Sequence, residues 1–239
     1  MLYDGVIVRF VAMPLKLFLF DLDGTLIDTA PTLVHAANRV LIDEGKTPLP
    51  LEVLRPFVSR GAPGMLGRGL GITTEHERFK ALRADFLRYY AEDITTGTVL
   101  FDGISELLAG LRQAGIATGI VTNKPEALTR QLLKALEIES IFDVVLGFDS
   151  PHCTMKPSPD SLLEALRIME VSATEAIYAG DDERDVLAAH TAQMRVASVA
   201  WGYSADDMKS WNADYHAQRP ADLLAWAQRL QTLPYATTC

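Results

Sequence analysis

Two hydrophobic patterns alternate along most of this chain. Short continuous apolar runs, such as Leu17–Phe20, are typical of strands covered on both faces, because such strands present neither face to water. Between these runs, apolar residues recur at the three- and four-residue spacing that places them on one side of a helix. From residue 101 onward the two patterns follow each other in regular order, so we expect a parallel sheet with helices on both faces.

The predicted elements of this α/β unit can be given as residue ranges. The expected strands are 17–20, 116–121, 144–146, 176–179 and 196–200. The expected helices are 104–114, 125–136, 159–169, 183–191 and 220–230.

Residues 28–98 show a different pattern. They contain no strong buried strand and instead predict helices at 30–46, 51–58 and 75–92, the first of which Gly45 would stop. We therefore expect an α/β core domain with a Rossmann-like fold, made of residues 14–27 and 99–232. An α-helical cap domain, residues 28–98, would interrupt it after the first strand.

Composition narrows the possible partners. The chain has 239 residues, of which 49% are hydrophobic, enough for one core domain with a smaller insert. Its net charge is −9 and it has no basic runs, which argues against nucleic acid as a partner. No apolar stretch is long enough to span a membrane. Residues 28–98 hold nine basic and nine acidic residues, so this neutral insert, with Arg55, Arg60 and Arg68, is a reasonable place to receive an anion.

The ends of the chain and its cysteines give weaker indications. Met1–Ala12 has neither a basic start nor a clear cleavage site, so we do not expect a signal peptide; translation from Met13 is an alternative reading. Two cysteines, Cys153 and Cys239, are too few for a disulfide framework, which favours a reduced, cytoplasmic protein.

Asp21 and Asp23 are the most informative residues for chemistry. They directly follow the apolar run 17–20, where two carboxylates are a poor choice for packing because burying an unpaired carboxylate costs several kcal/mol. They are a good choice for holding a divalent cation and for attacking an electrophile. Ligands of open parallel sheets bind outside the carboxyl ends of the strands, which is where this pair would lie.

Other polar residues are expected at the same edge of the sheet. They are Thr122 and Asn123 after the second strand, Asp181 and Asp185 after the strand at 176–179, and Lys156 before the helix at 159. A carboxylate nucleophile, a second carboxylate as acid and base, and a hydroxyl and an ammonium around the oxygens together suit phosphoryl transfer. Each residue also has an ordinary reading: Asp181, Asp182 and Thr122 as helix caps, and Lys156 as a solvated loop lysine. The order of all four groups on strand ends disfavours those readings jointly.

These four groups resemble the motifs of the haloacid dehalogenase superfamily. The matching segments are DLDGTL at 21–26, VTNKP at 121–125, Lys156-Pro157 and GDDERD at 180–185, and the resemblance covers nearly the whole chain, including the helical insert. Within the superfamily, DTAP at 28–31 together with VTNKP and GDDERD is similar to phosphoglycolate phosphatases and to N-acetylmuramic acid 6-phosphate phosphatases.

The resemblance implies a role for each site residue. Asp21 would be the nucleophile, and Asp23 would be the general acid and base and give a backbone carbonyl to the metal. Thr122 and Lys156 would bind the phosphoryl group, which Asn123 could also contact. Asp181 would complete a Mg²⁺ site with Asp21 and Asp23, and Asp185 would orient that site. Asp182 would lie behind the metal ligands or only cap a helix.

The expected function is hydrolysis of a small phosphomonoester through an aspartyl phosphate by a monomer or homodimer. Arg60, in a glycine-containing loop at 59–62, could read a carboxylate such as that of 2-phosphoglycolate, or the loop could be a plain turn. An N-acetylmuramic acid 6-phosphate or other sugar-phosphate phosphatase is the alternative, ahead of a phosphosugar mutase and a binding protein without activity. A dehalogenase is disfavoured because such enzymes need no metal and usually lack the aspartate that stands here at position 23.

Four further features are less telling. His35 is expected to be a packed or surface residue, His152 beside Cys153 an ordinary loop residue, and Trp201–Tyr203 a packing segment. Gln193 stands where the superfamily usually has a glycine, so we expect a strained or altered end to the helix at 183–191.

Overall fold

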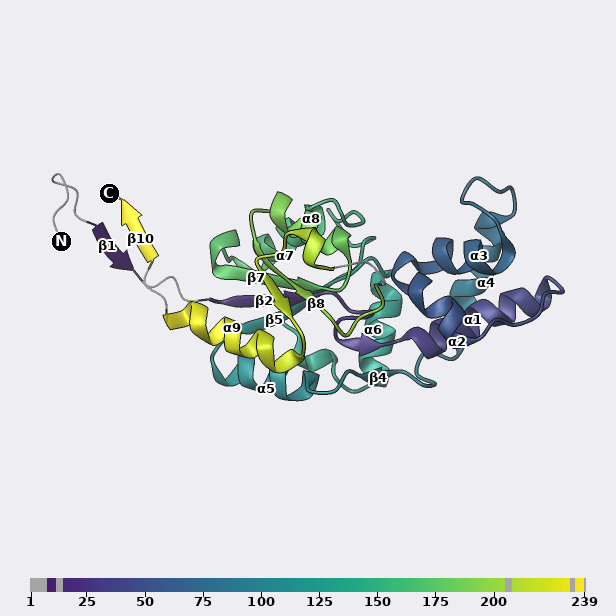
Figure 1. Ribbon diagram of the computed structural model, residues 1–239, viewed down its shortest axis with the longest axis horizontal. Helices are drawn as coiled ribbons and strands as arrows, with labels where there is room; N and C mark the ends of the chain where they lie inside the picture. Colours follow the sequence, from purple (N-terminus) through teal and green to yellow (C-terminus); the bar gives the residue numbers. More distant parts are fainter. Residues whose placement is uncertain (1–7, 12–14, 205–207, 233–234, 239) are drawn as a thin grey trace.

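A six-stranded parallel sheet forms the centre of the molecule (Figure 1). The computed structural model describes residues 8–11, 15–204, 208–232 and 235–238. The strands are β2 (Leu17–Phe20), β5 (Ala117–Val121), β6 (Val144–Leu146), β7 (Ala176–Gly180), β8 (Arg195–Val199) and β9 (Tyr215–Ala217). Their order, β6-β5-β2-β7-β8-β9, puts β2 between β5 and β7. The predicted α/β class with a Rossmann-like parallel sheet is confirmed.

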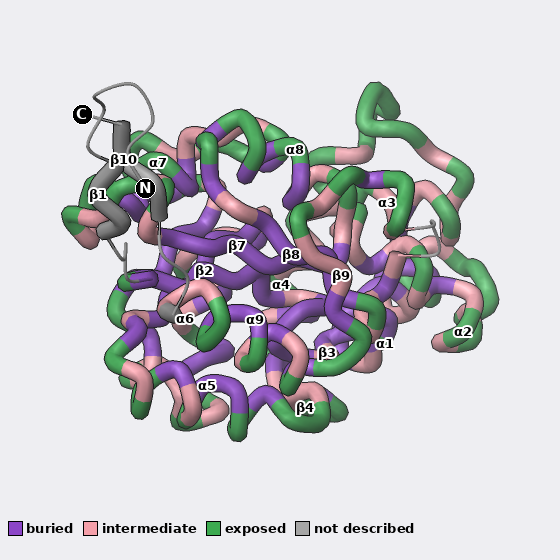
Figure 2. The backbone as a smooth tube through the Cα atoms, turned by 60° about the vertical axis from the view of Figure 1, so that its left-hand side comes forward, coloured by how far each residue is buried: buried purple, intermediate pink, exposed green. Residues whose placement is uncertain are grey.

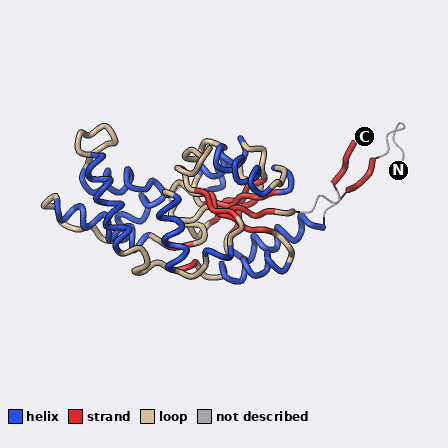
Figure 3. Tube along the Cα trace, turned by 180° about the vertical axis from the view of Figure 1, so that it is seen from behind, coloured by secondary structure: helices blue, strands red, loops and turns tan. Residues whose placement is uncertain are grey.

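Helices cover both faces of this sheet (Figure 3). They are α5 (Ile104–Gln113), α6 (Glu126–Ala135), α7 (Asp160–Met169), α8 (Glu183–Thr191) and α9 (Pro220–Thr232). Successive residues of β2 point to opposite faces: Phe18 and Phe20 join the apolar cluster that includes α5, α6 and α9, whereas Leu17 and Leu19 join the one with α7 and α8. This is why the strand is apolar at every position, and Figure 2 shows the sheet as the buried centre of the chain.

A group of helices follows the first strand and lies at one end of the molecule. This helical group consists of α1 (Ala30–Asp43), α2 (Leu51–Leu54), a 3₁₀ helix (Arg55–Arg60), α3 (Gly61–Leu70) and α4 (Phe79–Glu92). α1 packs against both α3 and α4. The chain enters and leaves the group through β3 (Ile27–Asp28) and β4 (Val99–Leu100), which pair antiparallel. This pairing fixes the two connections side by side.

α3 was not predicted from the sequence. Its ten residues include four glycines and a proline, which all lower helix propensity. Packing compensates, because Met65 and Leu66 are fully buried. Gly69 lies so close to Leu41 of α1 that a side chain there would collide with it, so the glycine permits this close approach.

Other element boundaries also differ from the predictions. α4 begins at Phe79 rather than at residue 75, because the polar residues before it form turns. β9 at the sheet edge was not predicted, nor were β1 (Val8–Val11) and β10 (Tyr235–Thr238), which pair antiparallel with each other. Met13 lies outside the described residues. Among the described helices, none has the length and apolar character needed to cross a bilayer.

The end of α8 has the strained geometry that the sequence predicts. The helix ends at Thr191, and Gln193 adopts a φ of 59°, the left-handed region that favours glycine. Its amide donates to the carbonyl of His190 at 3.0 Å, and that of Met194 donates to Ala189 at 2.9 Å. The helix thus ends in a glycine-type turn without a glycine.

Candidate active site

The three central strands bring the predicted site residues to one edge of the sheet. β2 lies between β5 and β7, so Asp21, Thr122 and Asp181, each directly after its strand, meet in space. The backbone continues the sheet pattern here, since the amide of Asp21 donates to the carbonyl of Ala179 at 2.9 Å. Side chains from distant parts of the sequence therefore share this edge.

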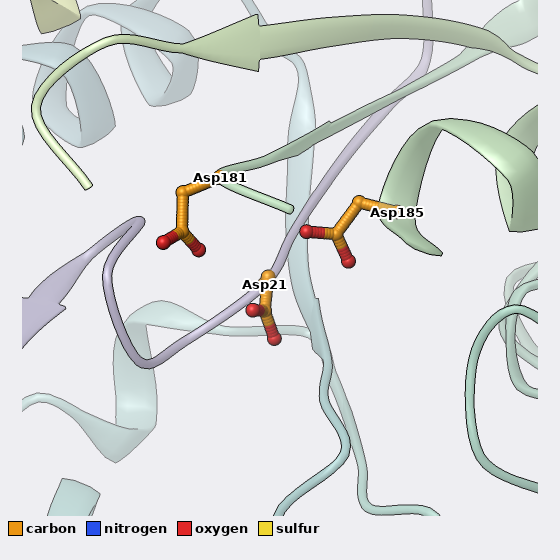
Figure 4. A group of neighbouring side chains, drawn as sticks. All are labelled: Asp21, Asp181 and Asp185. Atoms are coloured by element: carbon orange, nitrogen blue, oxygen red, sulfur yellow. The ribbon is translucent and has the colours of Figure 1, made fainter. Parts of the chain in front are cut away.

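Three carboxylates form an acidic cluster at this edge (Figure 4). Asp21, Asp181 and Asp185 each offer an oxygen, and these oxygens lie within 4.8 Å of one another. Burial raises the pKa of Asp21 to about 6, although Lys156 opposes the shift. Burial, together with the charges of Asp21 and Asp185, raises the pKa of Asp181 well above its usual value. The cluster has the donor set and the excess negative charge that a hard divalent cation needs.

Lys156 is the cation that lies within this cluster. The residue is 4% exposed, so it is not the solvated loop lysine that the sequence also allowed. Nζ lies 2.6 Å from Asp185 Oδ1 and 2.9 Å from Asp21 Oδ1. The contact with Asp21 is an ion pair whose angles do not meet those of a hydrogen bond. Burial alone would lower the pKa of Lys156, but Asp185 and Asp21 outweigh it and raise that pKa. One ammonium among three carboxylates leaves the cluster undercompensated.

Glycines leave the space that Asp181 occupies. Gly24, at a φ of 91°, and Gly202 both lie against the Asp181 carboxylate, and a side chain at either position would collide with it. The carboxylate accepts from the amide of Tyr203 at 2.9 Å and from Thr25 Oγ1 at 3.3 Å. Asp181 is therefore a buried, positioned side chain and not the N-cap of α8.

Asp23 points away from the acidic cluster. Its carboxylate accepts from Thr29 Oγ1 at 2.5 Å, and each of its oxygens lies 3.0 Å from Lys124 Nζ. Lys124 is 7% exposed and lies over the ring of Tyr90, with Nζ 4.3 Å from the ring centroid. Sequence reasoning did not assign a role to Lys124, although it lies within the VTNKP segment; that it is buried beside Asp23 depends on the tertiary fold.

Thr122 and Asn123 hold neighbouring backbone in place. Thr122 is buried, and its hydroxyl accepts from the amide of Lys124 at 3.3 Å, so it does not cap α6, whose N-cap is Pro125. Asn123 bonds both backbone groups of Lys156: its Oδ1 accepts from the amide at 2.7 Å and its Nδ2 donates to the carbonyl at 3.1 Å. Asn123 thus fixes the lysine loop to the end of β5.

A cavity of about 330 Å³ opens between the acidic edge and the helical group. Asp21, Asp23, Thr122 and Asn123 line it from the sheet. The wall from the helical group is mostly apolar, but it also contains Arg60 and Arg83. Arg60 ends the 3₁₀ helix and is followed at once by α3, so the expected loop at 59–62 is instead a junction of two helices. Arg68 does not line this cavity.

Arg184, another residue without a role in the sequence analysis, joins the two sides. Its Nη2 donates to the backbone carbonyl of Ser59 at 2.6 Å, while its Nε lies 2.7 Å from Asp182 Oδ1. Asp182 also accepts from the amide of Arg184 and so is the N-cap of α8. Ser59 Oγ lies 3.4 Å from Asp181 Oδ2. The sheet edge and the helical group therefore touch at the cavity mouth.

The aromatic segment after β8 does more than pack. Tyr203 Oη accepts from the amides of Thr29 and Ala30 at 2.7 and 3.1 Å and donates to Asp28 Oδ1 at 3.0 Å. Since the Tyr203 amide also bonds Asp181, this residue links the start of α1 to the acidic cluster. Trp201 Nε1 similarly donates to the carbonyl of Thr25 at 2.9 Å.

The two histidines are remote from this chemistry. His35 and His152 are exposed, and neither belongs to a group of potential metal ligands among the described residues. The expectations of a surface residue and an ordinary loop are met.

Comparisons with known proteins agree with this geometry. Residues 18–199 match the family model of haloacid dehalogenase-like hydrolases. A phosphoglycolate phosphatase of Xanthomonas campestris pv. campestris is 41% identical over 88% of this chain and 96% of its own length. An N-acetylmuramic acid 6-phosphate phosphatase of Pseudomonas putida is 31% identical over 88% of this chain and 95% of its own length. Among solved structures, a predicted phosphoglycolate phosphatase from Haemophilus somnus superposes with a TM-score of 0.79 at 26% identity, covering 89% of this chain and 98% of that one.

Proposed function

Because this chain belongs to the haloacid dehalogenase-like hydrolase family, we propose that it is a phosphatase for a small phosphomonoester of the 2-phosphoglycolate kind. The acidic edge of the sheet would hold the phosphoryl group, and the helical group, as a cap domain over residues 28–98, would hold the leaving group. The substrate would be a small phosphorylated metabolite. The free thiol of Cys153 agrees with the cytoplasm as the place of action.

Each step of the reaction has a residue that could carry it out. A carboxylate oxygen of Asp21 forms a bond to phosphorus as the ester P–O bond breaks, and Asp23 gives its proton to the departing oxygen. Asp23 then takes a proton from water, which attacks phosphorus and releases Asp21 and inorganic phosphate. Lys156 and the Thr122 hydroxyl would hold the phosphoryl oxygens as their charge redistributes.

One observation carries the proposal: Asp21 ends the central strand beside a buried lysine and faces a cavity. The lysine lies 2.9 Å from Asp21, and the cavity is lined by both Asp21 and Asp23. Acyl phosphate formation requires a nucleophile and an acid and base that face the substrate, and a cation beside the nucleophile. Asp21 and Asp23 have separate environments, since Asp21 lies beside Lys156 and Asp23 beside Lys124.

The cluster also fits Mg²⁺. The three carboxylates offer oxygens within 4.8 Å of one another, and Lys156 is the one cation described among them. The pKa values of Asp21 and Asp181 are raised, so their ionised carboxylates need more positive charge nearby. Asp21 and Asp181 would bind the ion through side chains and Asp23 through its backbone carbonyl, while Asp185, which bonds Lys156, would orient the site. When bound, Mg²⁺ would neutralise charge on the phosphoryl oxygens.

Two classes of leaving group suit the cavity. Arg60 and Arg83 favour an anionic group such as the carboxylate of 2-phosphoglycolate. A second candidate is a larger phosphosugar acid such as N-acetylmuramic acid 6-phosphate. The cavity volume of about 330 Å³ is larger than a two-carbon acid needs, and the mostly apolar wall could contact a larger leaving group. Both features favour the phosphosugar acid.

Phosphate release over a panel of metabolite phosphates tests the proposal. The panel includes 2-phosphoglycolate, N-acetylmuramic acid 6-phosphate, glucose 1-phosphate and nucleoside monophosphates, each with Mg²⁺ and with EDTA. We expect Mg²⁺-dependent release that Asp21→Asn abolishes, with one of the first two esters preferred. Release by Asp21→Asn at the wild-type rate would refute the nucleophile, and no release from any ester would refute the phosphatase.

A further inference from the structure

The hydroxyl of Tyr90 is buried at the cavity without a partner. Tyr90 lies near the end of α4, is 1% exposed and lines the cavity. Among the residues that the structure describes, no donor or acceptor bonds its Oη. Leaving a buried hydroxyl without a partner is unfavourable, so its partner is expected to come from outside the chain.

The nearby ammonium of Lys124 can only donate, so it cannot accept the proton of this hydroxyl. Lys124 Nζ lies over the face of the Tyr90 ring, 4.3 Å from the centroid, whereas the lone pairs of a phenol oxygen lie near the ring plane. Two of its donors face the two oxygens of Asp23 at 3.0 Å. The ammonium therefore adds positive potential at this point but leaves the hydroxyl free to donate. Burial raises the pKa of Tyr90 to about 12, so the hydroxyl keeps its proton at neutral pH.

The position of Tyr90 relative to Asp23 defines what it can bind. In the proposed reaction, the ester oxygen of the substrate lies against Asp23, which contacts Lys124, which in turn lies on Tyr90. Tyr90 belongs to the helical group that would hold the leaving group, so its hydroxyl lies on the side of the atoms that follow the ester oxygen. Nearby Lys124, Arg60 and Arg83 make this part of the cavity favourable to an anion.

We propose that Tyr90 is a specificity-determining residue that donates a hydrogen bond to an acceptor oxygen on the second carbon of the leaving group. This inference rests on the proposed phosphatase function and deepens it. The favoured substrates are 2-phosphoacids, whose carboxylate carries such an oxygen, over simple alkyl phosphates of the same length.

The test compares Tyr90→Phe with a matched variant one residue away. Tyr89→Phe also removes a phenol hydroxyl from α4, but that hydroxyl donates to Asp43 and does not line the cavity. The substrates are 2-phosphoglycolate and ethyl phosphate, which has the same length but no carboxylate. We expect Tyr90→Phe to lower the ratio of the two kcat/KM values about tenfold, as for loss of one hydrogen bond to a charged group, and Tyr89→Phe to leave the ratio unchanged.

Stability gives a second readout that needs no substrate. Tyr90→Phe removes an unpaired hydroxyl, so its midpoint of urea unfolding should equal or exceed that of the wild type, whereas Tyr89→Phe should lower it. If Tyr90→Phe leaves the ratio of the two kcat/KM values unchanged, or loses as much stability as Tyr89→Phe, the inference is overturned while the proposed function stands. Hydrolysis of neither ester by the wild type would instead refute 2-phosphoglycolate as the substrate class, and the inference with it, whereas the phosphatase activity itself is decided by the wider panel.

Discussion

At the scale of single residues, the acidic cluster links protonation to stability. Without a cation, Asp21 has a pKa of about 6 in the folded chain against 3.8 for an ordinary aspartate, so between these pH values the folded state holds a proton that the unfolded state has lost. Stability from this group is therefore lost as the pH rises from about 4 to about 6. A pKa difference of about two corresponds to roughly 3 kcal/mol.

Asp21→Asn removes this titration. In EDTA, the free energy of unfolding of the variant minus that of the wild type should grow by about 2–3 kcal/mol between pH 4 and pH 7. Urea unfolding at each pH measures it, with Asp102→Asn, on an exposed loop, as the control for loss of a charge. At pH 7, adding Mg²⁺ should stabilise the wild type and not the variant. A difference that stays constant with pH would contradict the raised pKa of Asp21.

The Lys124–Asp23 pair offers a second prediction at this scale. The side chains of Lys124 and Asp23 are 6% and 18% exposed, so removal of one partner leaves the other as an uncompensated, largely buried charge. Lys124→Met should cost about 2–3 kcal/mol of unfolding free energy, less than for a fully buried pair because Asp23 keeps some contact with water. In the double variant Lys124→Met/Asp23→Asn, much of that loss should return. Equal stabilities of the single and double variants would show that the pair is not coupled.

At the scale of elements, the end of α8 departs from the usual preference for glycine at a positive φ, because Gln193 occupies that position. Gln193 adopts a positive φ and is exposed, so its side chain adds strain without packing. Gln193→Gly should raise the unfolding free energy by about 0.5–1 kcal/mol, whereas Gln193→Ala, which keeps a Cβ, should give no such gain. Thermal and urea unfolding of the two variants side by side measure the difference. A gain of equal size in both would assign the effect to the glutamine side chain and not to the backbone.

Elements also show how far sequence reasoning reaches. Strands such as β2 and β6 were predicted with their exact bounds because an unbroken apolar run signals burial on both faces. α3 could not be predicted, since its glycines read as a loop and only the close packing against α1 makes it helical. The site behaves similarly. Strand ends predicted that Asp21 and Asp181 lie at one edge, and Lys156 was expected there just before the helix at 159. The burial of Lys124 and the contact of Arg184 with Ser59 exist only in the folded chain.

At the scale of the whole molecule, polar contacts of the segment 55–60 join the helical group to the sheet edge near the cavity. Arg184 donates to the Ser59 carbonyl at 2.6 Å, and Arg55 pairs with Asp28 at 2.8 Å while lying over the ring of Tyr203. Arg184 and Tyr203 follow β7 and β8, so the contacts of Arg184 with Ser59 and of Arg55 with Tyr203 join the segment 55–60 to the carboxyl edge of the sheet. Enclosure of a substrate in the cavity would depend on these contacts, because they hold the helical group against the edge that carries Asp21.

Arg184→Met tests this dependence. The arginine side chain is 34% exposed, so its hydrogen bond should contribute about 1 kcal/mol to closure, and its loss should speed amide hydrogen exchange in residues 55–70 about five- to tenfold. The KM for the best phosphomonoester should rise together with that exchange, since an open cap no longer encloses the leaving group. Arg39→Met is the control, because Arg39 pairs with Glu92 entirely within the helical group. If exchange over 55–70 is the same in both variants, the Arg184–Ser59 contact does not hold the cap, and the closure must then depend on Arg55 and the packing around Tyr203.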